Sequence, residues 1–276
     1  MLEIKFFEDI TQINMSREVG GKPVYWVAAY LVDGLLIDTG CRHTVDEFMD
    51  YLKKAPPKLA VNTHYHEDHV AANKPIQELF GIDIYAHPLS IPLIGRPATL
   101  FPYQEFTWGY PELSNVLPIP PVIRTNRFRF EVVEVPGHSR DHIGLVERSR
   151  GWCFTGDAVV GRSMKTIRPE DDMGVTLVSH RKLAELQMER LVLLTSLGKI
   201  FEEGRTILAD FAQFVEDLSR KSQDLHASGR SEDEIVTALF GGEDPLAAYT
   251  DGQFSIANLI RAVLRMREQR SAIGKE

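Results

Sequence analysis

Apolar and polar positions along the first 90 residues predict short strands and helices in a mixed order. An apolar run rich in β-branched and aromatic side chains is interrupted by Asp33-Gly34, a pair typical of tight hairpin turns. Further on, Val45, Phe48 and Leu52 fall at helical spacing. The expected elements are strands over 25–32, 35–37, 58–63 and 82–86, and helices over 44–54 and 69–80. This alternation of strands and helices is typical of an α/β fold.

Residues 88–127 interrupt this order. Prolines cluster in the segment, together with the aromatic residues Phe101, Tyr103, Phe106, Trp108 and Tyr110. A long segment of this kind in a compact enzyme is typical of a lid or a substrate-binding loop. The alternative is a surface insertion that is packed by its own aromatic side chains.

The second half of the chain begins with strands and ends with helices. Ser231 and Glu234 form the sequence signature of a capping box at the start of a helix, and Gly241-Gly242 ends it. We expect one domain over residues 1–215 and a helical extension over 216–276. Strands are also expected over 129–135, 143–147, 151–155 and 206–208. A helix is expected from about residue 174, with an apolar face formed by Leu183, Leu186, Met188, Leu191 and Leu194. The apolar face of a last helix is formed by Ile256, Leu259, Ile260, Val263 and Leu264.

Composition, net charge and cysteine content limit the classes of protein to which the chain can belong. The chain has 276 residues, of which 43% are hydrophobic and 25% charged, an ordinary globular composition. Its net charge of -8 disfavours nucleic acid and anionic membranes as partners. Cys41 and Cys153 are too few for a disulfide framework, the early acidic residues do not fit a signal peptide, and the longest apolar run is too short to cross a bilayer. We therefore expect a soluble, cytoplasmic protein.

The densest group of potential metal ligands directly follows the strand expected over residues 58–63. His64 and His66 project to the same side of an extended segment, and Asp68 and His69 follow at the turn into a helix. Imidazole and carboxylate groups together suit zinc, and also iron or manganese. Two more candidates stand at later strand ends, His138 in Pro-Gly-His and Asp157 in Thr-Gly-Asp. The sequence therefore predicts a metal centre assembled from several strand ends.

These motifs resemble those of the metallo-β-lactamase superfamily over roughly residues 20–160. The resemblance implies an αββα sandwich, here with added C-terminal helices. It also implies a set of metal ligands. The first metal would be held by His64, His66 and His138, the second by Asp68 and His69, and Asp157 would bridge the two.

The chemistry implied by the resemblance is hydrolysis. Two cations ~3.5–4 Å apart lower the pKa of a shared water, which then attacks a carbonyl or phosphoryl centre. Asp68 would orient this nucleophile and carry a proton to the leaving group. The leading hypothesis is a hydrolase with one or two zinc ions that acts on a small ester, thioester, lactone or amide.

The sequence departs from the family pattern at its end. The family usually has a last histidine in a turn after a late strand, and the matching place is expected at 206–212, where Asp210 is the nearest substitute. One metal, or two with a weaker second site, is therefore expected. An alternative is an oxidoreductase of the persulfide dioxygenase type, with one iron held by His64, His138 and Asp157. A phosphodiesterase is a further alternative, which the acidic charge disfavours.

Three other features are left with two interpretations each. Asp38, at a strand end, is either a ligand or a residue that holds a neighbouring loop. His142, four residues after His138, either supports the ligands or contacts substrate, or it forms hydrogen bonds within its loop. The apolar stripe of the last helix requires a partner surface, either in the same chain or in a second copy, so a homodimer is also open.

Overall fold

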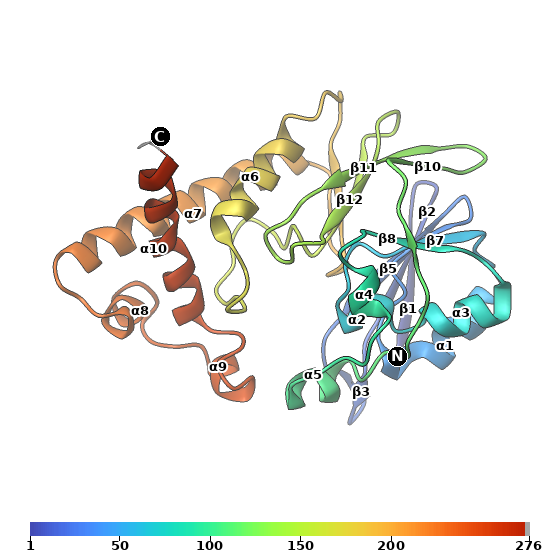
Figure 1. Cartoon of the computed structure of the whole chain (residues 1–276), viewed down its shortest axis with the longest axis horizontal. Helices are drawn as coiled ribbons and strands as arrows, with labels where there is room; N and C mark the ends of the chain where they lie inside the picture. Colours follow the sequence, from blue (N-terminus) through green and yellow to red (C-terminus); the bar gives the residue numbers. More distant parts are fainter. Residues whose placement is uncertain (274–276) are drawn as a thin grey trace. The chain divides into compact units, whose positions relative to one another are not determined.

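The computed structural model describes the backbone of residues 1–273 and the side chains of residues 1–266, in two compact units (Figure 1). The first unit comprises Met1–Val135, Arg140–Asp157 and Met188–Glu202. The second comprises Pro136–Ser139, Ala158–Gln187 and the chain from Glu203 onward. The domain border expected at residue 215 falls inside one continuous helix, α7 (Gly204–Ala227), and the chain passes from one unit to the other at other residues.

The first unit contains two large mixed sheets. The neighbouring strands β6 (Leu35–Ile37), β7 (Leu59–Val61), β8 (Ile84–Ala86) and β9 (Leu117–Pro118) run parallel, as do β13 (Trp152–Gly156) and β14 (Val192–Thr195), and the other pairs are antiparallel. A small ribbon pairs β3 (Glu18–Val19) with β4 (Lys22–Pro23). One sheet has the order β1 (Leu2–Phe7), β2 (Ile10–Met15), β5 (Val27–Val32), β6 (Leu35–Ile37), β7 (Leu59–Val61), β8 (Ile84–Ala86), β9 (Leu117–Pro118), and the other β10 (Val122–Arg124), β11 (Arg129–Glu134), β12 (Ile143–Glu147), β13 (Trp152–Gly156), β14 (Val192–Thr195), β15 (Ile200–Phe201).

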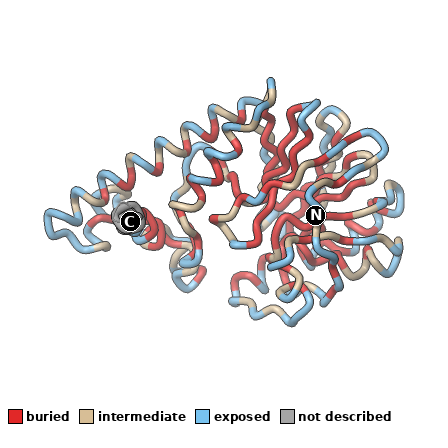
Figure 2. Tube along the Cα trace, turned by 45° about the horizontal axis from the view of Figure 1, so that its top comes forward, coloured by how far each residue is buried: buried red, intermediate tan, exposed pale blue. Residues whose placement is uncertain are grey.

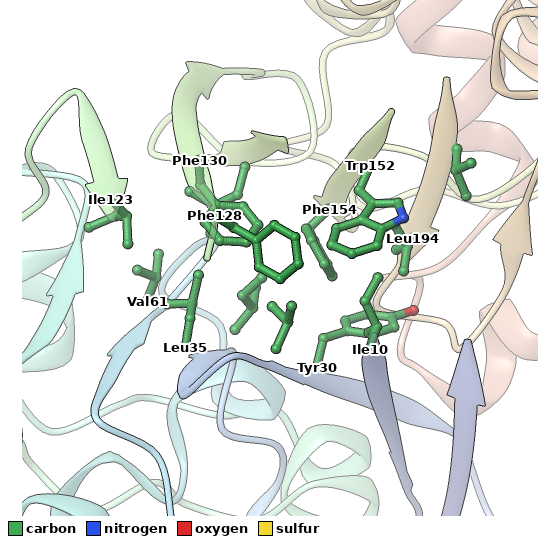
Figure 3. Close-up of a cluster of buried hydrophobic side chains, with 14 of the residues drawn as sticks. Ile10, Tyr30, Leu35, Val61, Ile123, Phe128, Phe130, Trp152, Phe154 and Leu194 are labelled. Carbon is green, nitrogen blue, oxygen red and sulfur yellow. The ribbon is translucent and has the colours of Figure 1, made fainter. Parts of the chain in front are cut away.

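The main core lies between the two sheets (Figure 3). Leu35 and Val61 point into it from the first sheet, and Phe130 and Phe154 from the second. Aromatic side chains fill much of this space, and Phe128 and Trp152 meet edge to face with ring centroids 5.1 Å apart. Buried residues gather along the strands, whereas the connecting loops are largely exposed (Figure 2). The face-to-face packing is that of a sandwich.

The helices of the first unit follow the predicted pattern with one correction. In α1 (Val45–Leu52) the residues at helical spacing are buried, as expected. The single helix expected over residues 69–80 is wrong, because the structure has α2 (Glu67–Val70) and α3 (Asn73–Phe80) with a turn between them. Pro75 explains the break, since it has no amide hydrogen to donate to the carbonyl four residues earlier. Gly81 ends α3 with a φ of 64°.

Two expectations for the region after residue 174 are wrong. The leucines expected on one long helix belong to different elements, because α6 (Met173–Ala184) ends early and Leu194 lies in β14. The strand expected over 206–208 is part of α7. Ile207 and Leu208 look like strand residues locally, but they are buried together with Phe211 and Val215 on one face of that helix.

The second unit is helical. It contains α6, α7, α8 (Glu232–Phe240), α9 (Pro245–Tyr249) and α10 (Ile256–Ile273). The predicted capping box is present, because the Ser231 hydroxyl accepts from the amide of Glu234 and the Glu234 carboxylate accepts from the amide of Ser231. The apolar stripe of α10 packs on α6, α7 and α8, so its partner surface lies in the same chain.

The fold class is confirmed as mixed α/β with a sheet sandwich and C-terminal helices. Cys41 and Cys153 are buried free thiols, and burial raises the pKa of Cys153 to about 12. Such a thiol is unreactive at neutral pH. Within residues 1–273, no helix has the length and apolar character needed to cross a membrane.

Candidate metal centre

Sheet topology explains why distant motifs of the first unit converge. Parallel strands end at the same edge of a sheet, and Ile37 of β6 is in register with Val61 of β7. Asp38 and Thr63, which follow these strands, are therefore neighbours. In the second sheet Gly156 of β13 is in register with Thr195 of β14. The two edges are joined by a hydrogen bond from the amide of Ile143 to the carbonyl of Thr63, 2.9 Å long.

His64 and His66 face each other at the end of β7. Nε2 of His64 lies 2.9 Å from Nδ1 of His66, and both side chains are buried. Two imidazole nitrogens on one tetrahedral zinc ion would be about 3.3 Å apart with zinc–nitrogen bonds of 2.0–2.1 Å. The pair therefore needs only a small adjustment to bind one cation. The hydroxyl of Thr63 lies 3.1 Å from Nδ1 of His64 and directs Nε2 toward His66.

Asp38 is the acceptor at the centre of this edge. Its carboxylate accepts from the Thr63 amide at 2.7 Å and from the Thr63 hydroxyl at 2.9 Å. Its Oδ2 lies 2.9 Å from Nδ1 of His69 and 3.4 Å from the hydroxyl of Ser196. A carboxylate only accepts, so Nδ1 of His69 carries the hydrogen and, in the neutral ring, Nε2 keeps the lone pair that can bind a metal. Of the two interpretations of Asp38, the structure therefore supports the one in which it holds neighbouring groups.

His69 lies between two carboxylates. Its Nε2 is buried, has no hydrogen-bond partner among the described residues, and lies 3.6 Å from Oδ2 of both Asp68 and Asp157. Burial lowers the pKa of His69, but the charges of Asp68, Asp38 and Asp157 outweigh it and hold this pKa well above its ordinary value. An arrangement that attracts a proton so strongly also attracts a divalent cation.

The residues of the first unit therefore fit a metal ion. Ligand atoms of His64, His69 and Asp157 all lie within 4.8 Å of one another. Nitrogen and oxygen donors of this kind suit zinc, iron or manganese. Of the six residues predicted as ligands, five lie in this unit: His64, His66, Asp68, His69 and Asp157.

The sixth predicted ligand, His138, lies in the segment Pro136–Ser139 of the second unit. Its Nδ1 is 3.3 Å from Oδ1 of Asp171, in the loop before α6. No motif in the sequence marks Asp171 as a functional residue. The only local signal was its place in the acidic run Glu170-Asp171-Asp172, which is also what a solvated loop contains.

His142 supports the position of Asp157. Its Nε2 accepts from the amide of Asp157 at 3.0 Å, and its ring stacks on that of His64 with centroids 4.6 Å apart. Gly156, with a φ of 51°, permits this approach, because a Cβ there would lie 2.6 Å from Cε1 of His142. The side chain is buried. Of the interpretations of His142, these contacts therefore favour the one in which it supports the predicted ligands over the one in which it forms hydrogen bonds only within its own loop.

The turn after the late strand is not where the sequence suggested. The last strand parallel to β13 is β14, so the turn at this edge begins at Ser196 and not at residue 206. Ser196 is buried, and its amide donates to the carbonyl of Gly156 at 3.1 Å. Asp210 instead lies in α7, where it forms an ion pair with Arg162 on an exposed surface. A serine hydroxyl thus occupies the turn in which a family histidine was expected.

The segment over residues 88–127 is anchored to the motif loop at two points. The side-chain amide of Gln104, in α5 (Pro102–Thr107), donates to the buried carboxylate of Glu67 at 2.8 Å. The hydroxyl of Ser90 donates to Asp141 at 2.6 Å, and the same carboxylate oxygen accepts from the amide of Tyr65 at 3.0 Å. No sequence pattern indicates these roles of Glu67 and Asp141, because each residue binds a distant segment.

The aromatic side chains of this segment are divided between its interior and its surface. Tyr103 and Trp108 are buried, and Trp108 packs edge to face on Tyr25 with ring centroids 5.6 Å apart. Phe101, Phe106 and Tyr110 are exposed. The segment therefore has its own small aromatic core and also presents apolar side chains to solvent.

Comparison with known proteins gives the family. The sequence model of the metallo-beta-lactamase superfamily matches residues 27–199, more than half of the chain. The chain belongs to the metallo-beta-lactamase superfamily. Among relatives in the superfamily, the hydroxyacylglutathione hydrolase GloC of Haemophilus influenzae is 28% identical over 144 residues, 49% of this chain and 66% of that protein. The hydroxyacylglutathione hydrolase of Chelativorans sp. is 30% identical over 140 residues, 49% of this chain and 47% of that protein.

The matches thus span about half to two thirds of the length of these relatives. Solved structures of the superfamily cover more of the chain at lower identity. A beta-lactamase domain protein from Burkholderia ambifaria has a TM-score of 0.69 at 16% identity and covers 98% of this chain and 85% of its own. A metallo-beta-lactamase family protein from Thermus thermophilus has a TM-score of 0.67 at 17% identity and covers 97% of this chain and 95% of its own. At these identities the likeness concerns the fold alone.

Proposed function

We propose that the chain is a metal-dependent hydrolase that cleaves a small acyl thioester of the hydroxyacylglutathione type. The observation that carries the proposal is the buried Nε2 of His69, which faces the carboxylates of Asp68 and Asp157 beside His64. The superfamily match and the relatives named hydroxyacylglutathione hydrolase support the reaction class.

The residue roles follow from chemistry and from the sequence motif. His64, His66 and His138 would hold one metal, Asp68 and His69 would belong to a second site, and Asp157 would contribute to both. The assignment of His138 rests on its Pro-Gly-His motif. When bound, a metal supplies Lewis acidity and a water that ionises near neutral pH.

Asp68 is the residue that moves the proton. Its carboxylate is buried beside Nε2 of His69, with Oδ2 3.6 Å from that nitrogen. In the reaction the oxygen of water bonds to the thioester carbonyl carbon, the carbon–sulfur bond breaks, and the proton of water passes through the Asp68 carboxylate to the leaving thiolate. General acid–base transfer of this kind contributes ~10²–10⁴-fold to rate.

The second site binds its metal more weakly than the first. A neutral serine hydroxyl is a poorer zinc ligand than an imidazole, and Ser196 occupies the turn after β14. Because the last histidine of the family pattern is missing, a site with a single iron also fits, and an oxidoreductase is therefore the competing function. Purified protein should therefore hold one metal per chain, and take up a second only at higher metal concentration.

The test combines metal analysis with a substrate panel. The full chain is loaded with zinc, iron or manganese and assayed on a hydroxyacylglutathione, a simple ester, a lactone and a phosphodiester, with oxygen uptake on a persulfide as a separate arm. We expect fastest hydrolysis of the thioester, with Asp68→Asn lowering kcat at least ~100-fold and Glu170→Gln as the control. Stoichiometric metal without hydrolysis of the thioester would refute the proposal, and iron with oxygen uptake would favour the oxidoreductase.

A further inference from the structure

The loop that carries His138 is packed against the start of α6 within the second unit. The hydroxyl of Ser179 donates to the carbonyl of Pro136 at 2.6 Å, and the amide of Asp172 donates to the carbonyl of Gly137 at 2.9 Å. Gly137 has a φ of 140°, and a Cβ on it would lie 2.8 Å from the backbone nitrogen of Thr176. The backbone just before His138 is therefore fixed by this helix.

Asp171 faces the side chain of His138. Its carboxylate is buried, and Oδ2 accepts from the amide of Arg168 at 3.0 Å. Its Oδ1 has no hydrogen-bond partner among the described residues, and it lies 3.3 Å from Nδ1 of His138. A histidine that binds a metal commonly presents its other ring nitrogen to a carboxylate, which fixes the tautomer and the ring orientation. Asp171 is placed to do this and to leave Nε2 of His138 for the metal.

The C-terminal segment holds the loop of Asp171 in turn. Ile167 and Ser255 exchange backbone hydrogen bonds of 3.3 and 3.4 Å, and the side-chain amide of Asn258 donates to the carbonyl of Ile167 at 3.1 Å. The guanidinium of Arg168 lies over the ring of Phe254, 5.1 Å from its centroid. The side chain of Ile167 is buried in the same core as α10. The C-terminal segment thus contacts Ile167 and Arg168. The amide of Arg168 binds Asp171, which faces His138.

We infer that Asp171 is a positioning residue that orients His138 for metal binding, and that residues 252–258 hold Asp171 in place. This inference rests on the metal site of the proposed function. Within the second unit, the C-terminal segment then fixes the orientation of His138.

The experiment measures zinc affinity of the full chain by competition with a chromophoric chelator. Asp171→Asn keeps the size of the side chain but replaces one carboxylate oxygen by an amide, and should weaken zinc binding ~10–100-fold. Glu170→Gln, an exposed neighbour in the same loop with the same charge change, should stay within ~2-fold. In a His138→Ala background, Asp171→Asn should cause no further loss, because the two residues act through one contact. Equal zinc affinity of wild type and Asp171→Asn, or fully additive losses in the double variant, would overturn the inference.

A second variant keeps the test decisive if Asp171→Asn does not fold. Phe254→Leu leaves both Asp171 and His138 in place and removes only the ring beneath Arg168. It should weaken zinc binding several-fold while circular dichroism stays native, and unchanged affinity would overturn the role given to residues 252–258. Failure of the proposed function looks different, because wild type would then bind zinc with the Asp171 effect intact but would hydrolyse no thioester.

Discussion

Replacing Asp38 by asparagine tests the arrangement of the metal centre most directly. The Asp38 carboxylate serves the amide of Thr63, the hydroxyl of Thr63 and Nδ1 of His69 at 2.7, 2.9 and 2.9 Å. Asparagine keeps one oxygen as an acceptor but has an amide group in place of the other. All three partners are donors, so this amide faces a donor and finds no acceptor. The φ of 61° at this position is tolerated by asparagine, so the backbone is not an added cause.

The expected cost follows from these contacts. One hydrogen bond with a charged partner is lost, at ~1.5–3 kcal/mol, and one buried donor is left without an acceptor, at ~1–3 kcal/mol. We expect a loss of about 3–5 kcal/mol in the free energy of unfolding, similar to breaking a buried ion pair. At ~2–4 °C per kcal/mol the melting temperature should fall by roughly 6–20 °C. Zinc affinity should fall ~10–100-fold, because His69 loses the group that orients it.

The assay is thermal unfolding of the metal-free and zinc-loaded protein, together with chelator competition. Asp46→Asn, an exposed residue of α1 with the same charge change, is the matched control and should stay near wild type. Loss of stability without loss of zinc affinity would show that Asp38 does not orient His69. A variant within ~1 kcal/mol of wild type would refute the estimate from hydrogen bonding altogether.

Three further changes test other parts of the molecule. Burial lowers the pKa of His180 to about 4 from 6.5, so the unfolded chain takes up its proton first and stability should fall by ~3 kcal/mol as the pH drops from 6.5 to 4. His180→Gln should flatten that fall in pH-dependent denaturation, and the exposed His226→Gln should not. Gln104→Leu removes the donor to Glu67 and should cost ~1.5–3 kcal/mol, with faster proteolysis within residues 88–127; equal proteolysis would show that this contact does not anchor the segment. Gly156→Ala should weaken zinc binding and cost at least ~1–3 kcal/mol, because its φ is positive and a Cβ would overlap an imidazole; a wild-type zinc titration would contradict this.

The sequence was most informative where function depends on local spacing. His64 and His66 are two residues apart in an extended segment, so their convergence follows from the geometry of a strand. The hairpin before Asp38 and the capping box at Ser231 are also local signals, and both are present in the structure. The motifs at Asp157 and His138 could be recognised in the sequence because each combines a potential ligand with a glycine that a tight turn needs.

The sequence was least informative where one residue serves a distant segment. Ser196 has no ligand-like character, and its strand was hidden by leucines that also fit a helical period. The run at Thr206 favours a strand locally, yet burial against other helices decides its structure. Asp171 contacts a histidine 33 positions away, and no spacing rule links the two. Such contacts depend on tertiary packing, and they leave no periodic pattern in a single sequence.

The contacts of Asp38 also bear on how the chain folds during synthesis. Its carboxylate contacts residues 25, 31 and 158 positions away, and the hydroxyl of Tyr30 bonds to a carbonyl 165 positions away. The edge of the metal centre is therefore incomplete until β14 has left the ribosome and paired with β13. Closing such long loops is slow compared with local pairing. The full set of contacts at the metal centre therefore forms only after residues 192–196 have been synthesised.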